Sequence, residues 1–321
     1  MEGTRRALLI GSPYNGLRGT RRDVQNMKEI LGGYGFLEDD IKTLISERAT
    51  RDNILKLWNL LIDDTLENDA VVIYYSGHGG LAEKARQGTG EQTTGEPQCF
   101  QFLVPYDFVS NSEGWNGILD IEISQLLFRT TSKTENVTYI VDSCHSARLG
   151  RRPENEEREA RFLRIDLSDS EYNKILEVKK EALSKAAARD GTPDFTRPDY
   201  SNQNVVRIAA AAADSTAYSF PFNGNWAGMM TEYLCEVLRC LGRDVSWLTI
   251  MLAVDALVGR EFTSNPQQPR SAGADYRKPF SIETDMSTTL LADIGKSDVI
   301  IQGGRALGVE VGDVYILRQW N

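Results

Sequence analysis

The sequence has little histidine and cysteine, the residues that build most zinc sites and disulfide frameworks. It contains two histidines, His78 and His145, and four cysteines among 321 residues. A zinc site usually needs about four Cys, His or carboxylate ligands, and no paired spacing of these residues supplies them. Four cysteines in so long a chain do not form a disulfide framework, which favours a reducing, cytoplasmic setting. We therefore expect no metal site and no cofactor.

Long apolar runs and an excess of positive charge are also missing. The longest apolar helical stretch, 247–258, is too short to span a bilayer and carries Asp255. The N-terminus reaches Gly11 after only a few apolar residues, so we expect no signal peptide. Lys and Arg number 36 against 46 Asp and Glu, a formal net charge of −10. An acidic surface repels phosphate and anionic lipid, so neither nucleic acid nor membrane is an expected partner, and cationic ligands are favoured.

What the sequence does contain is enough apolar material, 41% of the residues, to form a full core. Short, wholly apolar segments alternate with segments whose apolar residues recur at helical spacing. This alternation predicts a doubly wound, mostly parallel sheet with helices on both faces, in the α/β class. The expected strands are 7–10, 41–45, 70–75, 100–104, 137–141, 205–213 and 280–282, and the expected helices begin near 20, 53, 121, 226 and 246.

Two chemically reactive side chains come directly after expected strands, His78 after 70–75 and Cys144 after 137–141. Ligands of doubly wound sheets bind beyond the carboxyl ends of the strands. A thiol is mostly protonated at neutral pH, so a nucleophilic cysteine needs a base nearby. His145 is poorly placed for this, because adjacent residues of an extended chain point to opposite sides. We therefore predict that His78 activates Cys144.

The glycines around His78 allow close approach of the backbone. The N–H groups of Gly79 and Cys144 are therefore candidates to hold an oxyanion. A plainer interpretation is also open, in which the segment around His78 is a tight turn and Cys144 is a small buried hydrophobe. The presence of both motifs at carboxyl ends of one sheet favours catalysis.

These two motifs make the sequence resemble a known superfamily. Residues 75–80 and 142–147, which read Tyr-Ser-Gly-His-Gly-Gly and Asp-Ser-Cys-His-Ser-Ala, are similar to the His and Cys motifs of caspases and metacaspases. The likeness is greatest to metacaspases and to caspase domains of fungal multidomain proteins, and it covers nearly the whole chain. It implies a caspase-like six-stranded sheet, with a large-subunit region at 1–150 and a small-subunit region at 204–284. Between them, interleaved basic and acidic residues predict a charged, exposed intersubunit linker at 151–203 with a helix near 172–188. After them, residues 285–321 are expected to form a partial β extension with a hairpin around 308–313.

The resemblance also implies a reaction. In this superfamily the cysteine is the nucleophile and the histidine the general acid/base, so these roles pass to Cys144 and His78, and peptide bonds would be cleaved through a thioester. Caspases cleave after Asp, whereas metacaspases cleave after Arg or Lys with an acidic pocket. Protein or peptide substrates with basic residues are the partners implied. The positions that match the acidic pocket are Asp23, Ser76, Asp142 and Asp214.

Local patterns are also consistent with purely structural roles for some of these residues. Asp23 ends a Thr-x-x-Asp segment that has the form of a capping box, so it could stabilise a helix N-terminus. Asp142 could be an ordinary turn aspartate. The spacing favours the pocket, because Ser76 and Asp142 each precede their catalytic neighbour by two residues and share its side of an extended chain.

The sequence departs from the metacaspase pattern in places. Many members bind activating calcium with an acidic loop after the histidine and a pair of aspartates before the third helix. Here the loop 83–97 is rich in Gly, Thr and Gln, and the pair reads Asp120–Ile121. Calcium prefers several carboxylate or carbonyl oxygens, so these changes argue against calcium activation. Trp226 stands in a segment that also differs, where it either lines the substrate cleft or packs.

The linker is where members of the superfamily are cut into two subunits. The exposed basic residues expected to be candidates for self-cleavage are Arg151, Arg152, Arg161, Arg164, Lys179, Lys180 and Arg189. Any one of them fits a solvated charged helix equally well.

The leading hypothesis is a cysteine endopeptidase that cleaves after Arg or Lys and processes itself, as part of a larger multidomain protein. The alternative is a caspase-fold pseudoenzyme or interaction module of a signalling or cell-death protein. A phosphate-binding α/β domain is a weaker third hypothesis, because the glycines at 16–19 precede a helix without the Gly-Lys-Ser/Thr of a P-loop.

Overall fold

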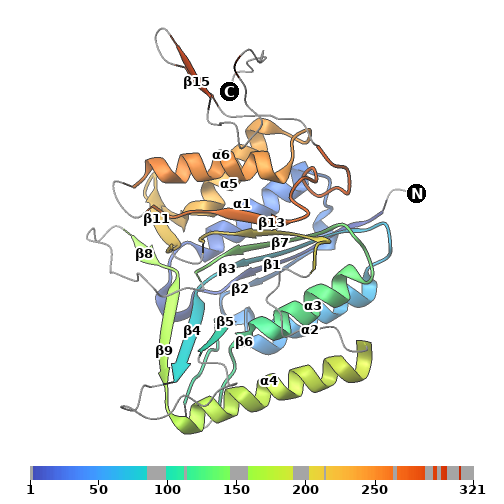
Figure 1. The fold of residues 1–321 in the computed structure, drawn as a ribbon, viewed down its shortest axis with the longest axis vertical. Coiled ribbons are helices and arrows are strands. Elements are labelled where there is room, and N and C mark those ends of the chain that lie inside the picture. The colour runs from blue at the N-terminus through green and yellow to red at the C-terminus, as the bar shows by residue number, and fades with distance from the viewer. Residues whose placement is uncertain are drawn as a thin grey trace.

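The central sheet of the computed structural model has six strands in the order β13-β10-β7-β3-β1-β2. All neighbouring strands are parallel except β10 and β13. This confirms the predicted mostly parallel, doubly wound sheet (Figure 1). The strands are β1 Arg5–Gly11, β2 Ile41–Ile45, β3 Ala70–Ser76, β7 Val137–Asp142, β10 Val205–Ala209 and β13 Arg270–Gly273. The structure describes residues 3–84, 99–111, 114–144, 158–190, 202–212, 215–262, 266–285, 292–294, 298–301 and 311.

Helices cover both faces of this sheet, which explains why every residue of β3 and β7 is buried. Figure 1 shows α1, α5 and α6 on one face and α2 and α3 on the other, with α4 outside them. The bounds are α1 Thr20–Gly33, α2 Arg51–Asp64, α3 Asp120–Thr131, α4 Asp169–Asp190, α5 Met229–Leu241 and α6 Trp247–Arg260. Short 3-10 turns lie at Tyr14–Gly16, Glu38–Asp40 and Ser46–Arg48.

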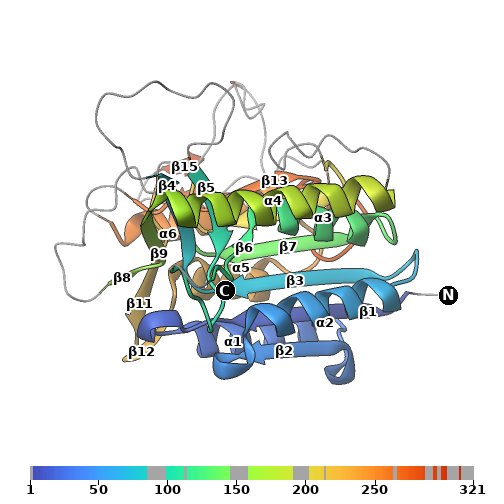
Figure 2. The ribbon, with the colours of Figure 1, turned by 90° about the horizontal axis from the view of Figure 1, so that it is seen from below.

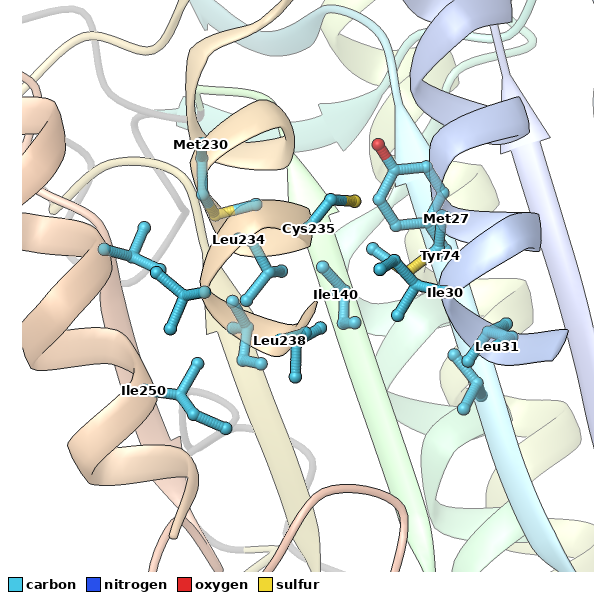
Figure 3. Packing of buried hydrophobic residues seen from close by; sticks show 14 of the residues in the cluster. Met27, Ile30, Leu31, Tyr74, Ile140, Met230, Leu234, Cys235, Leu238 and Ile250 are labelled. Atoms are coloured by element: carbon cyan, nitrogen blue, oxygen red, sulfur yellow. The ribbon is translucent and has the colours of Figure 1, made fainter. Parts of the chain in front are cut away.

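The larger core lies between the sheet and α1, α5 and α6. In Figure 3, Met27 and Ile30 of α1 face Leu234 of α5 across Tyr74 and Ile140 of the sheet. All five side chains are buried. Packing on this face fixes α1 and α5 against β3 and β7, the two strands whose carboxyl ends precede the predicted catalytic residues.

Two smaller sheets lie at the carboxyl edge of the central sheet (Figure 2). One has the strand order β6-β5-β4-β9, and the other has the order β12-β11-β8. Their strands are β4 Gly79–Lys84, β5 Cys99–Leu103, β6 Ile118–Leu119, β8 Glu159–Ala160, β9 Phe162–Leu167, β11 Tyr218–Phe222 and β12 Asn225–Gly228. Strands β8 and β9 belong to different sheets and are separated only by Arg161, so the chain passes from one sheet to the other at this residue.

One predicted strand is wrong. Residues 280–282 do not form a strand, and the sixth strand is β13 instead. Phe280 has a backbone φ of 56°, which no strand residue adopts. Its ring is buried edge-on against Tyr34, Phe36 and Trp247. The apolar character of this segment therefore comes from an anchored turn.

The region 151–203 is also more structured than an exposed linker. The predicted helix is confirmed as α4, but the segment 159–167 contains β8 and β9, which belong to the two smaller sheets. Farther along, β14 Ala292–Ile294 pairs with β15 Val299–Ile301 in an antiparallel ribbon. The hairpin predicted around 308–313 lies outside the described residues, apart from a turn at Val311.

Candidate active site

The parallel register of β3 and β7 brings the two predicted catalytic residues to one edge. Ser76 pairs with Asp142 at the carboxyl ends of these strands, and His78 and Cys144 each follow two residues later. The two residues therefore follow neighbouring strands at the same edge of the sheet. That His78 activates Cys144 stays a prediction.

A peptide carbonyl lies between the two N–H groups that the sequence selected as oxyanion donors. The carbonyl oxygen of Arg161 accepts from the backbone N–H of Gly79 at 3.0 Å and of Cys144 at 3.1 Å. On the other side of the same residue, the N–H of Arg161 donates to the carbonyl of Ala217 at 2.9 Å. The backbone of Arg161 is therefore held at both ends, with its carbonyl polarised by two donors beside a thiol.

The side chain of Arg161 fills the predicted acidic pocket. One terminal nitrogen, Nη2, lies 2.6 Å from Oδ2 of Asp23. The other, Nη1, donates to Oγ of Ser76 at 2.9 Å and to the backbone carbonyl of Asp142 at 2.9 Å. Nε donates to Oγ of Ser219 at 3.0 Å. The expectation that Arg161 is exposed is wrong, because its exposed fraction is 0%. Charge density along the linker could not reveal that the chain folds back into its own pocket.

Asp23 belongs to this pocket and does not cap α1, the helix in which it lies. Its Oδ1 accepts from the N–H of Gly228 at 2.7 Å, and its Oδ2 accepts from Oγ of Ser76 at 2.7 Å. Helix α1 begins after Gly19, whose φ of 96° is left-handed, and no side chain caps it. The capping-box interpretation of Asp23 is thus wrong. A glycine at the helix start gives close contact with the backbone of Ala227, where a Cβ would lie 2.9 Å away.

Asp142 forms the opposite wall of the pocket. Its Oδ2 accepts from the N–H of Thr231 at 3.0 Å and from the hydroxyl of Thr231 at 2.5 Å. Its Oδ1 lies 3.4 Å from Nη1 of Arg161. The residue ends β7 and is wholly buried, so it is not an exposed turn aspartate. Burial raises the pKa of Asp142, and the nearby Arg161 opposes that rise.

The guanidinium stays charged in this setting. Burial acts to lower the pKa of Arg161, but the carboxylates of Asp142 and Asp23 outweigh it, and the pKa lies above the ordinary value. A buried cation with two carboxylates and two hydroxyl partners has its hydrogen-bonding capacity largely met. The pocket is therefore chemically matched to a planar cation.

Sequence reasoning missed two residues of the pocket. Ser219 accepts the hydrogen bond from Nε of Arg161, and no local pattern identifies it. Gly228 leaves the space that the guanidinium uses, since a Cβ there would lie 2.2 Å from Oδ2 of Asp142 and 2.7 Å from Cζ of Arg161. The sequence marks Gly228 only by its position just before a helix. Glycine is common there as an ordinary helix cap, so the position does not identify a pocket residue.

The surroundings of His78 and Cys144 bear on the proposed acid–base chemistry. Burial, followed by the charge of Arg161, lowers the pKa of His78 to about 4, so its imidazole is neutral at pH 7 and can accept a proton. Sγ of Cys144 lies 3.2 Å from the carbonyl oxygen of Ser215, to which the thiol donates. The site therefore contains a neutral base, a thiol, and a carbonyl held by two N–H donors.

The segment around Arg161 lies in the site as an extended peptide. Upstream, Ala160 pairs with Tyr218 and Glu159 with Ser219, antiparallel to β11. Downstream, Phe162 pairs with Gly79, parallel to β4. Backbone pairing on both sides of one residue is how a sheet edge holds an added strand.

Some predicted features lie outside the described residues, among them Asp214, Arg151 and Arg152. Within the described part of the chain, no group of three or more His, Cys, Asp or Glu residues is placed to hold a metal ion. The helices that the structure describes include none long and apolar enough to cross a membrane. The absence of a cofactor and of calcium activation stay predictions.

Known proteins resemble this chain over most of its length. The family model described as metacaspase, peptidase C14 domain, matches residues 5–151. The Metacaspase-1 proteins of Lodderomyces elongisporus and Candida albicans are each 33% identical to this chain, over 309 and 324 residues. In each case the match covers 87% of this chain and 67% of the relative. Metacaspase-1 of Scheffersomyces stipitis is 26% identical over 307 residues, 87% of this chain and 73% of the relative.

The fold has a counterpart among solved structures. A crystal structure of a Geobacter sulfurreducens protein superposes with a TM-score of 0.55 at 18% identity, covering 87% of this chain and 98% of that one. Identity this low supports the fold alone. The two relatives at 33% identity and the matching domain model show that this chain belongs to the metacaspase family of cysteine peptidases.

Proposed function

We propose that this protein is a cysteine endopeptidase that cleaves after arginine, and less readily after lysine, and that it cuts its own chain between Arg161 and Phe162. The observation that supports this most directly is the placement of Arg161. Its carbonyl contacts the N–H groups of Gly79 and Cys144, and its guanidinium lies between Asp23 and Asp142. An arginine bound in this way has the features of a residue about to be cleaved.

The proposed reaction begins when His78 takes the proton of the Cys144 thiol. The sulfur then bonds to the carbonyl carbon of Arg161, and the negative charge that develops on the oxygen is stabilised by the N–H groups of Gly79 and Cys144. Collapse of this intermediate breaks the bond to the nitrogen of Phe162, which leaves as an amine with the proton from His78. Water then hydrolyses the thioester and regenerates the thiol.

The pocket accounts for the preference for arginine. A guanidinium makes separate hydrogen bonds from Nε, Nη1 and Nη2 here, to Ser219, Ser76 and Asp23. The single ammonium of lysine carries the charge but cannot reproduce this fan of donors, so it should be accepted more weakly. An aspartate side chain would meet two buried carboxylates and lack any cation, which excludes it.

The purified chain is expected to cut itself into two fragments, the second beginning with Phe162, because Arg161 already lies in the pocket. Cys144→Ala removes the nucleophile and should leave the chain intact. The measurement is N-terminal sequencing and intact mass of the products after incubation, with fluorogenic peptides ending in Arg, Lys or Asp assayed in parallel. A chain that stays whole and cleaves none of the peptides would instead favour the interaction-module hypothesis.

The rate of self-cleavage is expected to fall at low pH with a midpoint near pH 4, instead of near the ordinary histidine pKa of about 6.5. The base must be neutral to accept the thiol proton, and burial and the charge of Arg161 lower the pKa of His78 to about 4. The rate should therefore be insensitive to histidine protonation between about pH 5 and 7 and fall as the pH drops through 4. Single-turnover cleavage followed over pH 3.5–7.5 measures this, and a midpoint near 6.5 would contradict it.

A further inference from the structure

Two side chains upstream of Arg161 also have partners in the site. Glu159 lies two residues before Arg161, in the strand β8 that pairs with β11, and Arg158 lies directly before that strand. Both side chains contact other residues of the protein. Each meets a group of residues contributed by parts of the chain distant in sequence, which is the arrangement expected of side-chain subsites.

Glu159 is bound by Arg18. Its Oε1 lies 2.6 Å from Nε of Arg18, and its Oε2 accepts from the backbone N–H of Arg18 at 3.0 Å. The guanidinium of Arg18 is itself stacked on Trp226, with Cζ 3.2 Å from the ring centroid. An exposed ion pair alone would contribute little. Here the stacking holds Arg18 in place and the carboxylate has two donors, so less side-chain freedom is lost on binding.

Arg158 is bound by aromatic rings. Its Cζ lies 4.5 Å from the ring centroid of Phe262 and 5.6 Å from that of Phe220. Its Nη2 donates to the backbone carbonyl of Glu261 at 2.6 Å. Two aromatic faces and a carbonyl oxygen attract a cation and offer nothing to an anion. This pair of rings selects a basic side chain.

We infer that the enzyme reads a longer sequence than the cleaved arginine: an acidic residue two positions before it, recognised by Arg18, and a basic residue three positions before it, recognised by Phe220 and Phe262. The preferred substrates are therefore protein segments of the form Arg-Glu-x-Arg, cleaved after the last arginine. The inference rests on the proposed function, because it extends the same site along the substrate.

The experiment compares fluorogenic tetrapeptides that all end in arginine. The parent is Arg-Glu-Ala-Arg, and the two variants are Arg-Lys-Ala-Arg and Glu-Glu-Ala-Arg. We expect kcat/KM to fall about tenfold for each variant, as expected for the loss of a stacked ion pair or of a cation–π contact with a charged hydrogen bond. The enzyme is the full chain after self-processing. The released arginine end competes with all peptides equally, so ratios of kcat/KM are unaffected.

Enzyme variants test which residues do the reading. Arg18→Glu should reverse the order of the Glu and Lys peptides, and the matched control is Arg21→Glu, an exposed charge reversal nearby that should keep it. Phe262→Ala should abolish the preference for a basic first residue. Phe220→Leu is the second variant, for use if Phe262→Ala folds poorly, and it should weaken the same preference. Equal cleavage of all three peptides by the unmodified enzyme would overturn the inference and leave the proposed function standing. Failure to cleave any arginine peptide would overturn the proposed function itself.

Discussion

Replacing Asp142 by asparagine is expected to reduce cleavage of arginine peptides by about 10²–10³-fold, and replacement by alanine to abolish it. Removing one partner of a buried charge pair costs about 3–5 kcal/mol, and each 1.4 kcal/mol is a factor of ten. Asparagine keeps an oxygen that can accept from Thr231, so it removes the charge while preserving the hydrogen bonds that position this wall. The measurement is kcat/KM for a peptide ending in arginine.

The control for this experiment is chemical. Cys144 in the Asp142 variants should still react with a small alkylating agent at the unmodified rate, because its thiol donates to the backbone carbonyl of Ser215 and not to the Asp142 carboxylate. Asp166→Asn, an exposed carboxylate on β9, should leave peptide cleavage unchanged. If arginine peptides are cleaved normally by Asp142→Asn, the pocket assigned here is not the one that selects the substrate.

Replacing Arg161 by alanine is expected to prevent self-cleavage at Phe162 and to destabilise the uncut protein by about 3–5 kcal/mol, because Asp23 and Asp142 are left buried without a cation. The free energy of unfolding is best measured in the Cys144→Ala background, which stays uncut, and self-cleavage is measured in the active chain. Arg164→Ala is the matched control. It removes an arginine from β9 that is half exposed and paired with Glu83, so neither cleavage nor stability should change appreciably.

This loss of stability should depend on pH, with a sign that identifies its cause. Burial already raises the pKa of Asp142, and without the opposing charge of Arg161 it rises further. A carboxyl whose pKa is higher in the folded state favours folding when protonated. The variant should therefore approach the stability of its parent near pH 4 and fall below it as the pH rises to 7. Thermal melting over this range measures the difference, and a deficit that is constant with pH would mean that the effect comes from lost packing alone.

Much of the fold could be predicted because its determinants are local and strong. The segments that form β3 and β7 are apolar throughout, which is required of strands covered on both faces, and each is followed at once by its reactive residue. Their position in the chain was sufficient to predict that His78 and Cys144 follow the carboxyl ends of strands in one parallel sheet. The prediction failed at 280–282, where a buried aromatic anchor has the same apolar composition as a strand.

Within the proposed site, short sequence motifs pointed to the histidine and the cysteine, and the family resemblance pointed to the acidic positions Asp23 and Asp142. The sequence could not choose among seven basic residues of the linker, because charge says nothing about which of them the chain can deliver to the pocket. Only the tertiary structure decided that Arg161 occupies it, since that depends on β8 and β9 pairing with strands far away in sequence. Ser219, Gly228 and the rings around Arg158 come from segments that only folding brings together. The motif residues are therefore local in the sequence, whereas the pocket around Arg161 depends on long-range contacts.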